Sequence, residues 1–280
     1  MKIHTINTGN FKLDGGAMFG VVPKSIWSKT NPPDEKNLCS WAMRCLLIEE
    51  GNKLILIDNG IGNKQDAKFY SHFDLHGEDS LEKSLNKLGF SSNDITDMFL
   101  THLHFDHCGG SIKFKNDKIG YEPAFKNATY WSNAQHWECA TQPNPREKAS
   151  FLKENILPIQ ESSQLKFTEE NAQLFPFMKI MFTRGHTDAM MLPHIRYNDK
   201  TIVFMADLIP STAHIPLPYV MGYDTRPLLT LTEKEKFLNE AAEKNYILFL
   251  EHDNYTECCT VQQTEKGVRL KETFALTEIL

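Results

Sequence analysis

Residues 100–110 read LTHLHFDHCGG and place three histidines and one aspartate within six residues. Imidazole and carboxylate groups are ligands of divalent metal ions such as zinc. Residues two apart in an extended strand project to the same side, so we predict that His102, His104 and Asp106 face one point. His107 has the opposite parity and reaches that region if the chain turns at the two glycines that follow. The stretch therefore predicts a metal site, with His107 directed at a second ion.

Three later segments end on residues of the same kind. His186 follows KIMFT, Asp207 follows TIVFM and His252 follows YILFL, and each of these apolar runs predicts a strand. Taken singly, each residue could be a polar group at the end of a strand. One ion needs at least a third protein ligand and a pair of ions needs a bridging group, so we predict that these residues complete the site.

The elements that must position these residues are indicated by hydrophobic patterning. Two β-branched and leucine-rich runs in residues 45–62 flank a turn at residues 50–52 and predict a hairpin, and residues 94–107 predict a strand that continues into the histidine cluster. Leucines at helical spacing predict a helix after Asp79 or Ser80 that stops at Gly89. Further helices are predicted around residues 146–157 and over 232–245, with a proline-rich loop over 210–227.

Length and composition indicate one globular protein. We predict a single domain over residues 1–280, with an insertion or lid around residues 114–177, where the pattern loosens. The apolar fraction is 41% and the charged fraction is 24%, both close to globular averages. Six cysteines without C-x-x-C spacing are read as reduced thiols.

Charge and hydropathy argue against two classes of partner. A formal net charge of −6 provides no basic field for a nucleic acid backbone. No apolar run approaches the roughly 20 residues of a membrane span, and the first residues lack the apolar run of a signal peptide. We therefore predict a cytoplasmic protein whose partner is a small molecule, with neither nucleic acid nor membrane involved.

The order of the polar residues resembles a known superfamily. The stretch from Asp58 to His252 is similar to the metallo-β-lactamase superfamily of metal-dependent hydrolases. The similarity lies in the order of four motifs: His-x-His-x-Asp-His, then Gly-His, then Ala-Asp, then a histidine at the end of a strand. The resemblance implies an α/β fold, the αβ/βα four-layer sandwich, with metals at the strand edges. An aspartate between the third and last histidine, where many true β-lactamases have cysteine, resembles dinuclear lactonases, glyoxalases II and phosphoesterases.

The resemblance also implies roles for the ligands. It implies two divalent ions, zinc first, with iron, manganese or cobalt as alternatives. The first ion would be held by His102, His104 and His186, the second by Asp106, His107 and His252, with Asp207 bridging the two. A hydroxide between the ions would attack a carbonyl carbon, and Asp106 could then carry a proton to the leaving alkoxide. Asp58 is predicted to orient a ligand histidine.

A finer resemblance concerns the substrate. HLHFDH, together with DGGAMFGVVPKSIW at residues 14–27, is similar to N-acyl-homoserine lactonases of the Bacillus quorum-quenching type. This similarity implies opening of a lactone ring, with Met18 and Phe19 bordering the substrate, although these two residues read as core or strand residues without it. Phe105 faces away from the ligands by parity and is expected to border the substrate from below. In those lactonases a tyrosine lies three residues after the bridging aspartate, and this chain has Pro210 there. The substitutes for that contact are His214, Tyr219 and Tyr223.

Several alternatives stay open at this point. An aryl ester or organophosphate ester hydrolase could use the same centre with a wider pocket. A glyoxalase II-like thioester hydrolase is weakened because its motif usually lies nearer the N-terminus than residue 102. A redox di-iron protein would want glutamate in place of His104, and a non-catalytic metal binder would lack a ligand. The expected partner is a lactone or ester, and a homodimer is one option for the assembly.

Overall fold

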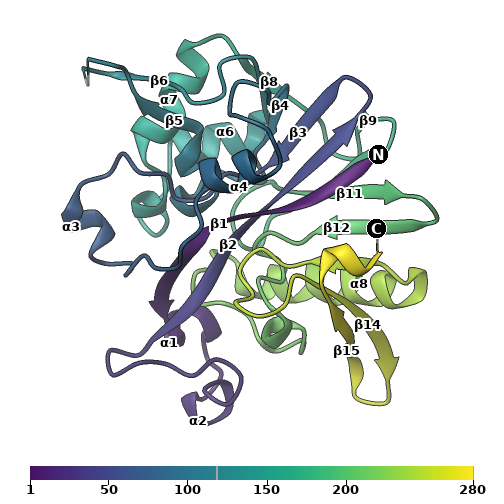
Figure 1. The fold of residues 1–280 in the computed structure, drawn as a ribbon. Helices are drawn as coiled ribbons and strands as arrows, with labels where there is room; N and C mark the ends of the chain where they lie inside the picture. Colours follow the sequence, from purple (N-terminus) through teal and green to yellow (C-terminus); the bar gives the residue numbers. More distant parts are fainter. Residues whose placement is uncertain (118, 280) are drawn as a thin grey trace. The chain divides into compact units, whose positions relative to one another are not determined.

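The computed structural model describes residues 1–117 and 119–279, in which two mixed β-sheets, a short β-ribbon and several helices are formed (Figure 1). The first sheet has six strands in the order β1-β2-β3-β4-β7-β8. Their bounds are β1 (Lys2–Asp14), β2 (Leu38–Glu50), β3 (Lys53–Ile57), β4 (Asp97–Phe99), β7 (Thr129–Ser132) and β8 (Leu165–Phe167). Strands β3, β4, β7 and β8 are parallel neighbours, whereas β2 is antiparallel to β3.

The second sheet has seven strands in the order β15-β14-β13-β12-β11-β10-β9. Their bounds are β9 (Gln173–Phe175), β10 (Met178–Thr183), β11 (Met190–Tyr197), β12 (Lys200–Phe204), β13 (Ile247–Phe249), β14 (Cys258–Thr264) and β15 (Gly267–Phe274). Within this sheet β12 and β13 are parallel and the other neighbours are antiparallel. The ribbon pairs β5 (Ile112–Phe114) with β6 (Tyr121–Pro123).

The helices are mostly short. The α-helices are α1 (Gly15–Phe19), α2 (Lys24–Trp27), α3 (Ala67–Tyr70), α4 (Leu81–Lys87), α5 (Phe105–Cys108), α6 (Ala134–Thr141), α7 (Lys153–Glu161) and α8 (Pro227–Lys244). Single 3₁₀ turns are η1 (Gly109–Ser111), η2 (Lys148–Ser150), η3 (Thr212–His214) and η4 (Leu276–Ile279). Among the described residues, none of the helices combines the length and apolar character that crossing a membrane requires.

The chain forms two compact units. The first comprises Met1–Gly9 and Met43–Glu169, and the second comprises Asn10–Ala42 and Glu170–Leu280. Residues 114–177 include β7 and β8, which are strands of the first sheet. A single domain over residues 1–280 with an insertion or lid around 114–177 stays a prediction.

The core of the first unit joins strands to helices. Leu56 of β3 and Met98 of β4 are completely buried, and they belong to one apolar cluster with Leu85 of α4 and Ile159 of α7. Figure 1 shows α4 and α6 beside the strands of this unit. Because β4 lies inside the sheet and this cluster fixes it, the loop that leaves its end starts from a rigid base.

Several predicted elements are confirmed. The hairpin forms as β2 and β3, with Glu50 paired to Lys53 across the turn. Helix α4 starts after Ser80, whose hydroxyl accepts a hydrogen bond from the Lys83 amide at 3.3 Å, and Gly89 beyond its end has φ +83°. Ser80 is thus the N-cap, and the glycine supplies the left-handed conformation that ends the helix.

The helix predicted over 146–157 is misplaced. The structure has η2, then two extended residues at 151–152, then α7, which contains Pro158 in its interior. Proline lacks the amide proton that an interior helical position donates, and it usually interrupts a helix. The helix instead accommodates it, and α6 was not predicted at all.

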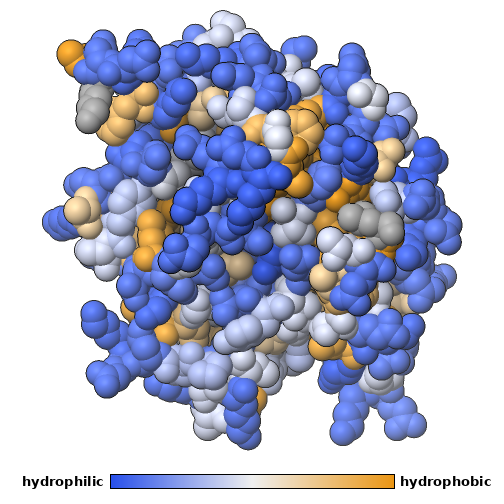
Figure 2. Space-filling view, viewed as in Figure 1, coloured by the Kyte–Doolittle hydropathy of each residue, from blue (hydrophilic) through white to orange (hydrophobic). Residues whose placement is uncertain are grey.

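The surface agrees with the composition. Most large apolar side chains are buried, and the face shown in Figure 2 is predominantly hydrophilic, with apolar side chains in separate spots.

His194 gives the second unit a pH-dependent stability. Its ring on β11 packs against Phe237 of α8 and against Tyr246, and burial lowers its pKa to about 4. Unfolded histidine takes up its proton near pH 6.5, so between pH 6.5 and 4 the unfolded chain binds more protons. The free energy of unfolding therefore falls as pH falls through that window.

We expect the variant His194→Leu to lose less stability than the native chain between pH 6.5 and 4, by up to about 3 kcal/mol. Urea unfolding at a series of pH values measures this difference. His72→Leu, at an exposed histidine, is the control. Parallel pH curves for His194→Leu and the native chain would contradict the assignment.

Candidate metal centre

The histidine cluster begins as a loop and continues into a helical turn. Strand β4 ends at Phe99, His104 is extended with φ −64° and ψ 150°, and α5 starts at Phe105. We predict from the sequence that Asp106 lies in the same extended strand end as His102 and His104. This prediction is wrong, because Asp106 lies in α5. The amides of His107 and Cys108 both donate to the His104 carbonyl at 3.1 Å, which winds the chain and turns Asp106 and His107 out of the strand direction.

The two glycines after the cluster have a different role from the predicted one. Gly109 has an ordinary helical backbone with φ −62°, so the turn does not depend on glycine. A Cβ at Gly109 would lie 2.1 Å from the Ile61 carbonyl oxygen, and one at Gly110 would lie 2.5 Å from that of Asn59. The glycines are required because two backbone segments approach each other too closely for any side chain.

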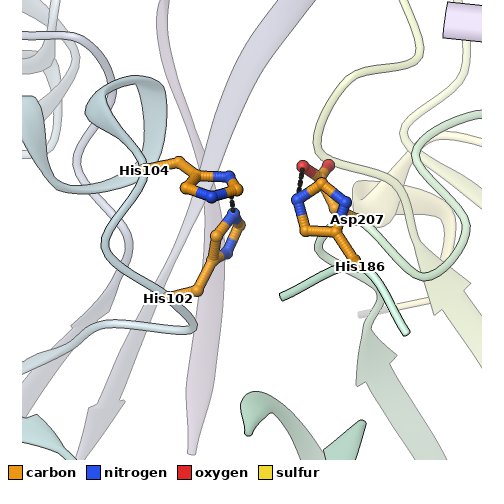
Figure 3. A group of neighbouring side chains, drawn as sticks. All are labelled: His102, His104, His186 and Asp207. Carbon is orange, nitrogen blue, oxygen red and sulfur yellow. Dashed lines mark hydrogen bonds and ion pairs between the residues drawn. The ribbon is translucent and has the colours of Figure 1, made fainter. Parts of the chain in front are cut away.

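In the first unit, His102 and His104 direct one nitrogen each at the other. Nε2 of His102 lies 3.1 Å from Nδ1 of His104 (Figure 3). The other nitrogen of His102, Nδ1, lies 3.1 Å from the Thr101 hydroxyl. Two ligands at about 2.0–2.1 Å from a tetrahedral zinc ion lie about 3.3 Å apart, so the spacing of this pair fits a shared ion.

His107 is held by Asp58, as expected for that aspartate. Nδ1 of His107 lies 3.1 Å from Asp58 Oδ2, and the same carboxylate accepts hydrogen bonds from the Thr101 amide at 2.8 Å and hydroxyl at 2.6 Å. Nε2 of His107 lies 3.7 Å from Asp106 Oδ2. Asp58 therefore fixes the ring of His107 and leaves Nε2 beside a second potential ligand.

In the second unit, Asp207 lies between two histidines. Its Oδ2 is 3.0 Å from Nε2 of His186 (Figure 3), and its Oδ1 is 3.2 Å from Nε2 of His252. The parallel pairing of β12 with β13 explains part of this arrangement, because Asp207 and His252 each follow the end of their strand by the same short distance. A carboxylate with one oxygen toward each histidine has the geometry of a bridging ligand.

The outer nitrogens of these histidines are also occupied. Nδ1 of His186 lies 2.8 Å from Asp224 Oδ1, and Nδ1 of His252 donates to the Ala42 carbonyl at 2.8 Å. Burial by itself lowers the pKa of His186, but the carboxylates of Asp207 and Asp224 outweigh it and raise the pKa to about 10. Two buried carboxylates around one imidazole thus favour a positive charge at this point.

The donor chemistry fits divalent metal ions. In both units a histidine has one nitrogen on an orienting group and the other beside a further potential ligand, which is how proteins fix the tautomer and direction of metal-binding imidazoles. His102, His104, Asp106 and His107 in the first unit offer atoms that could contribute to holding a metal ion, as do His186, Asp207 and His252 in the second unit. Five imidazoles and two carboxylates suit zinc, iron, manganese or cobalt.

Sequence reasoning missed several orienting groups. Asp224 lies in the proline-rich loop, and His136 of α6 accepts a hydrogen bond from the Leu103 amide at 2.8 Å, between two ligand candidates. No local pattern marks these residues, because each acts through a contact distant in sequence.

His214 is a buried packing residue. Its ring stacks on Phe19 with centroids 4.6 Å apart. Nε2 donates to the Met18 carbonyl at 2.9 Å, so Nδ1 accepts from the Ser211 hydroxyl at 2.8 Å. Burial lowers its pKa to about 4, which keeps the ring neutral at pH 7. The structure thus places His214, the last residue of η3, against α1 with both nitrogens bonded; its catalytic role stays a prediction.

The other predicted substrate contacts differ in exposure. Met18 and Phe19 in α1 are 1% and 0% exposed, whereas Tyr223 is 40% exposed. Tyr219 meets the Phe19 ring edge-on, and Phe105 packs against Phe69 and Phe73 in the first unit. Their contacts with a substrate remain predictions.

Comparisons with known proteins identify the family. The family model of the Metallo-beta-lactamase superfamily matches residues 44–252. Among curated proteins, the N-acyl homoserine lactonase AiiA of Bacillus thuringiensis subsp. kurstaki is 24% identical, over 90% of this chain and 93% of its own, and one from Bacillus cereus is 25% identical with the same coverage. The chain belongs to the metallo-β-lactamase superfamily.

Solved structures agree. A probable metal-dependent hydrolase from Staphylococcus aureus superposes with a TM-score of 0.87 at 29% identity, covering 98% of both chains. The dizinc quorum-quenching lactonase AidC, in complex with a product, superposes with a TM-score of 0.79 at 22% identity, covering 98% of this chain and 95% of its own. The predicted metallo-β-lactamase fold is confirmed, and the chain is a hydrolase of this superfamily.

Removing the carboxylate behind His186 tests the orienting role of Asp224. We expect Asp224→Ala to weaken the apparent affinity for zinc about 10- to 100-fold, because the His186 ring loses the bond that fixes its direction. Competition with a chromophoric chelator measures the affinity. Asp199→Ala, at an exposed aspartate, is the control. Equal affinity in Asp224→Ala and the control would show that Asp224 does not position the ligand.

Proposed function

We propose that this protein opens the ring of an N-acyl-homoserine lactone at a dinuclear metal centre. The proposed ligands are His102, His104 and His186 for the first ion, Asp106, His107 and His252 for the second, and Asp207 as the bridge. The observation that carries the centre is the position of Asp207, which has one oxygen on His186 and the other on His252. The oriented histidines of both units support it.

Two divalent ions held there would supply a hydroxide nucleophile at neutral pH and polarise the lactone carbonyl. The chain's own residues supply the rest. Asp58, Thr101 and Asp224 hold the ligand rings in one direction, so little reorganisation is needed when charge develops. Asp106, on the first turn of α5, is proposed to hold the proton and pass it to the alkoxide of the opened ring.

The choice of a lactone rests on similarity. Curated relatives over nine tenths of the chain are named N-acyl homoserine lactonases. The lactonase AidC was solved in complex with an N-acyl-L-homoserine product. We therefore extend this substrate class to the present chain, with zinc as the first choice of metal and the cytoplasm as the place of action. A single domain and a homodimer complete the proposal.

Contacts to the substrate must differ from those in lactonases that have a tyrosine three residues after the bridging aspartate, because Pro210 stands here. Of the three substitutes, Tyr223 has the most exposed side chain, and Tyr219 lies in the same loop. His214 is buried with both nitrogens bonded. We propose that the tyrosines contact the substrate and that His214, with Met18 and Phe19, supports this loop from the core. Phe105 is proposed to border the substrate.

The bridging role of Asp207 gives a direct test. We expect Asp207→Asn to lose at least one of two bound ions and to lower turnover roughly 100-fold or more, because the amide cannot bridge two cations. Elemental analysis of the purified protein measures the metal content. Two retained ions with full turnover would refute the ligand assignment.

The variant His214→Gln is the control for Asp207→Asn, because His214 is not a proposed metal ligand. We expect it to keep both ions but to unfold more easily by about 1–3 kcal/mol, because the hydrogen bonds to Met18 and Ser211 and the stacking on Phe19 are perturbed. Thermal unfolding and metal analysis on the same preparation separate the two effects. Loss of metal in His214→Gln would instead place this residue closer to the centre.

The substrate class is tested by a panel. With metal restored, we expect a long-chain N-acyl-homoserine lactone to be hydrolysed with kcat/KM near about 10⁴ M⁻¹s⁻¹ or above. An aryl ester and a phosphotriester should be far slower. Acid release in a weakly buffered dye solution follows all three reactions. A faster ester or phosphotriester reaction would support a hydrolytic metal centre but contradict the proposed lactone substrate.

A further inference from the structure

Glu147 is a buried carboxylate whose two oxygens have different surroundings. It is 6% exposed, at the residue directly before η2. Oε1 accepts a hydrogen bond from Asn144 Nδ2 at 2.5 Å and one from the Cys139 thiol at 3.6 Å. Oε2 faces Nε2 of His104 at 4.0 Å. One oxygen is therefore fixed to its own segment, while the other is directed at a proposed metal ligand.

The loop that carries Glu147 is itself well fixed. The side-chain oxygen of Asn144 accepts hydrogen bonds from the Arg146 amide at 2.9 Å and the Glu147 amide at 3.3 Å. The ring of Phe151, 5% exposed, lies against the His104 ring with centroids 4.8 Å apart. The carboxylate thus meets His104 in surroundings with little water, where an ion pair or charge-assisted hydrogen bond is stronger than at the surface.

The other four proposed histidine ligands each have an orienting group at the outer nitrogen. Glu147 lies in the corresponding place at His104. Nδ1 of His104 already faces Nε2 of His102 at 3.1 Å, so the nitrogen toward Glu147 is the outer one. Asp58 occupies the equivalent place behind His107, and Asp224 occupies it behind His186. Glu147 also places a carboxylate behind a ligand histidine, at the longer distance of 4.0 Å, from a segment that sequence reasoning assigned to an insertion or lid.

We propose that Glu147 is a positioning residue of the metal centre. Its carboxylate lies at ion-pair distance from Nε2 of His104, which favours the proton on that nitrogen and so leaves Nδ1 to face the metal. This inference rests on the proposed metal centre and does not depend on the substrate. It also gives residues 144–151 a role in metal binding, in addition to any contact with a substrate.

Cobalt binding to the full-length protein tests the proposal. The variants are Glu147→Gln, which keeps the size of the side chain, and Glu138→Gln, at an exposed position of α6, as the matched control. Chelator competition gives the affinity for Co²⁺, and the visible absorption of bound Co²⁺ reports the ligand geometry. We expect Glu147→Gln to bind one Co²⁺ about 10- to 100-fold more weakly with an altered spectrum. The control should match the native protein.

A purely structural role of Glu147 has a different outcome. It would lower the unfolding temperature of the metal-free protein while leaving the affinity and the Co²⁺ spectrum of the folded variant unchanged, and that result would overturn the proposal. If Glu147→Gln does not fold, Glu147→Asp is the second variant, because it draws the carboxylate back by one methylene. We expect Glu147→Asp to lose part of the Co²⁺ affinity. Native Co²⁺ affinity in Glu147→Asp would also overturn the proposal. Weakened cobalt binding supports the proposal whether or not the native protein hydrolyses a lactone.

Discussion

Much of the candidate metal centre depends on the groups that hold the outer nitrogens of its buried imidazoles. An imidazole placed at the end of a strand can rotate, and only one of its nitrogens can be a ligand in a given direction. In this protein the outer nitrogens are held by a hydroxyl, by carboxylates and by a backbone carbonyl, as at His102, His107, His186 and His252. The inner nitrogens are thereby aimed before any ion binds. This preorganisation is the property that a metal-dependent hydrolase of the metallo-β-lactamase superfamily needs.

Asp58 shows how much of the loop follows from one such partner. Its carboxylate accepts the amide and the hydroxyl of Thr101 and meets Nδ1 of His107, so it fixes the start and the end of the histidine loop together. Asp58 itself has φ +56°, a conformation that costs most residues about 1 kcal/mol and that aspartate tolerates better than others. The strained backbone places a buried carboxylate where three groups need it.

Such groups also explain the polar interior of the second unit. Asp207 and Asp224 would be unfavourable as isolated buried carboxylates, and they are tolerable because His186 lies between them and because a metal cation is proposed to bind there. His214 is instead buried as a neutral ring. With no carboxylate bonded to it, the ring is held neutral between Ser211 and the Met18 carbonyl, and its place is fixed by stacking on Phe19. Similar residues thus have different chemistry according to what surrounds them.

From the sequence alone we predicted a metal site, the superfamily and the strands that precede the candidate histidine and aspartate ligands, because these depend on residue types and on patterns only a few residues long. It also predicted the hairpin of β2 and β3 and the cap at Ser80, which are local. The turn of α5, the interior Pro158 of α7 and the close approach at Gly109 were decided by tertiary structure. The same holds for Thr101, His136 and Asp224 as orienting groups. Each of these depends on a hydrogen bond or a backbone contact that folding creates, and none of them leaves a periodic signal in the chain.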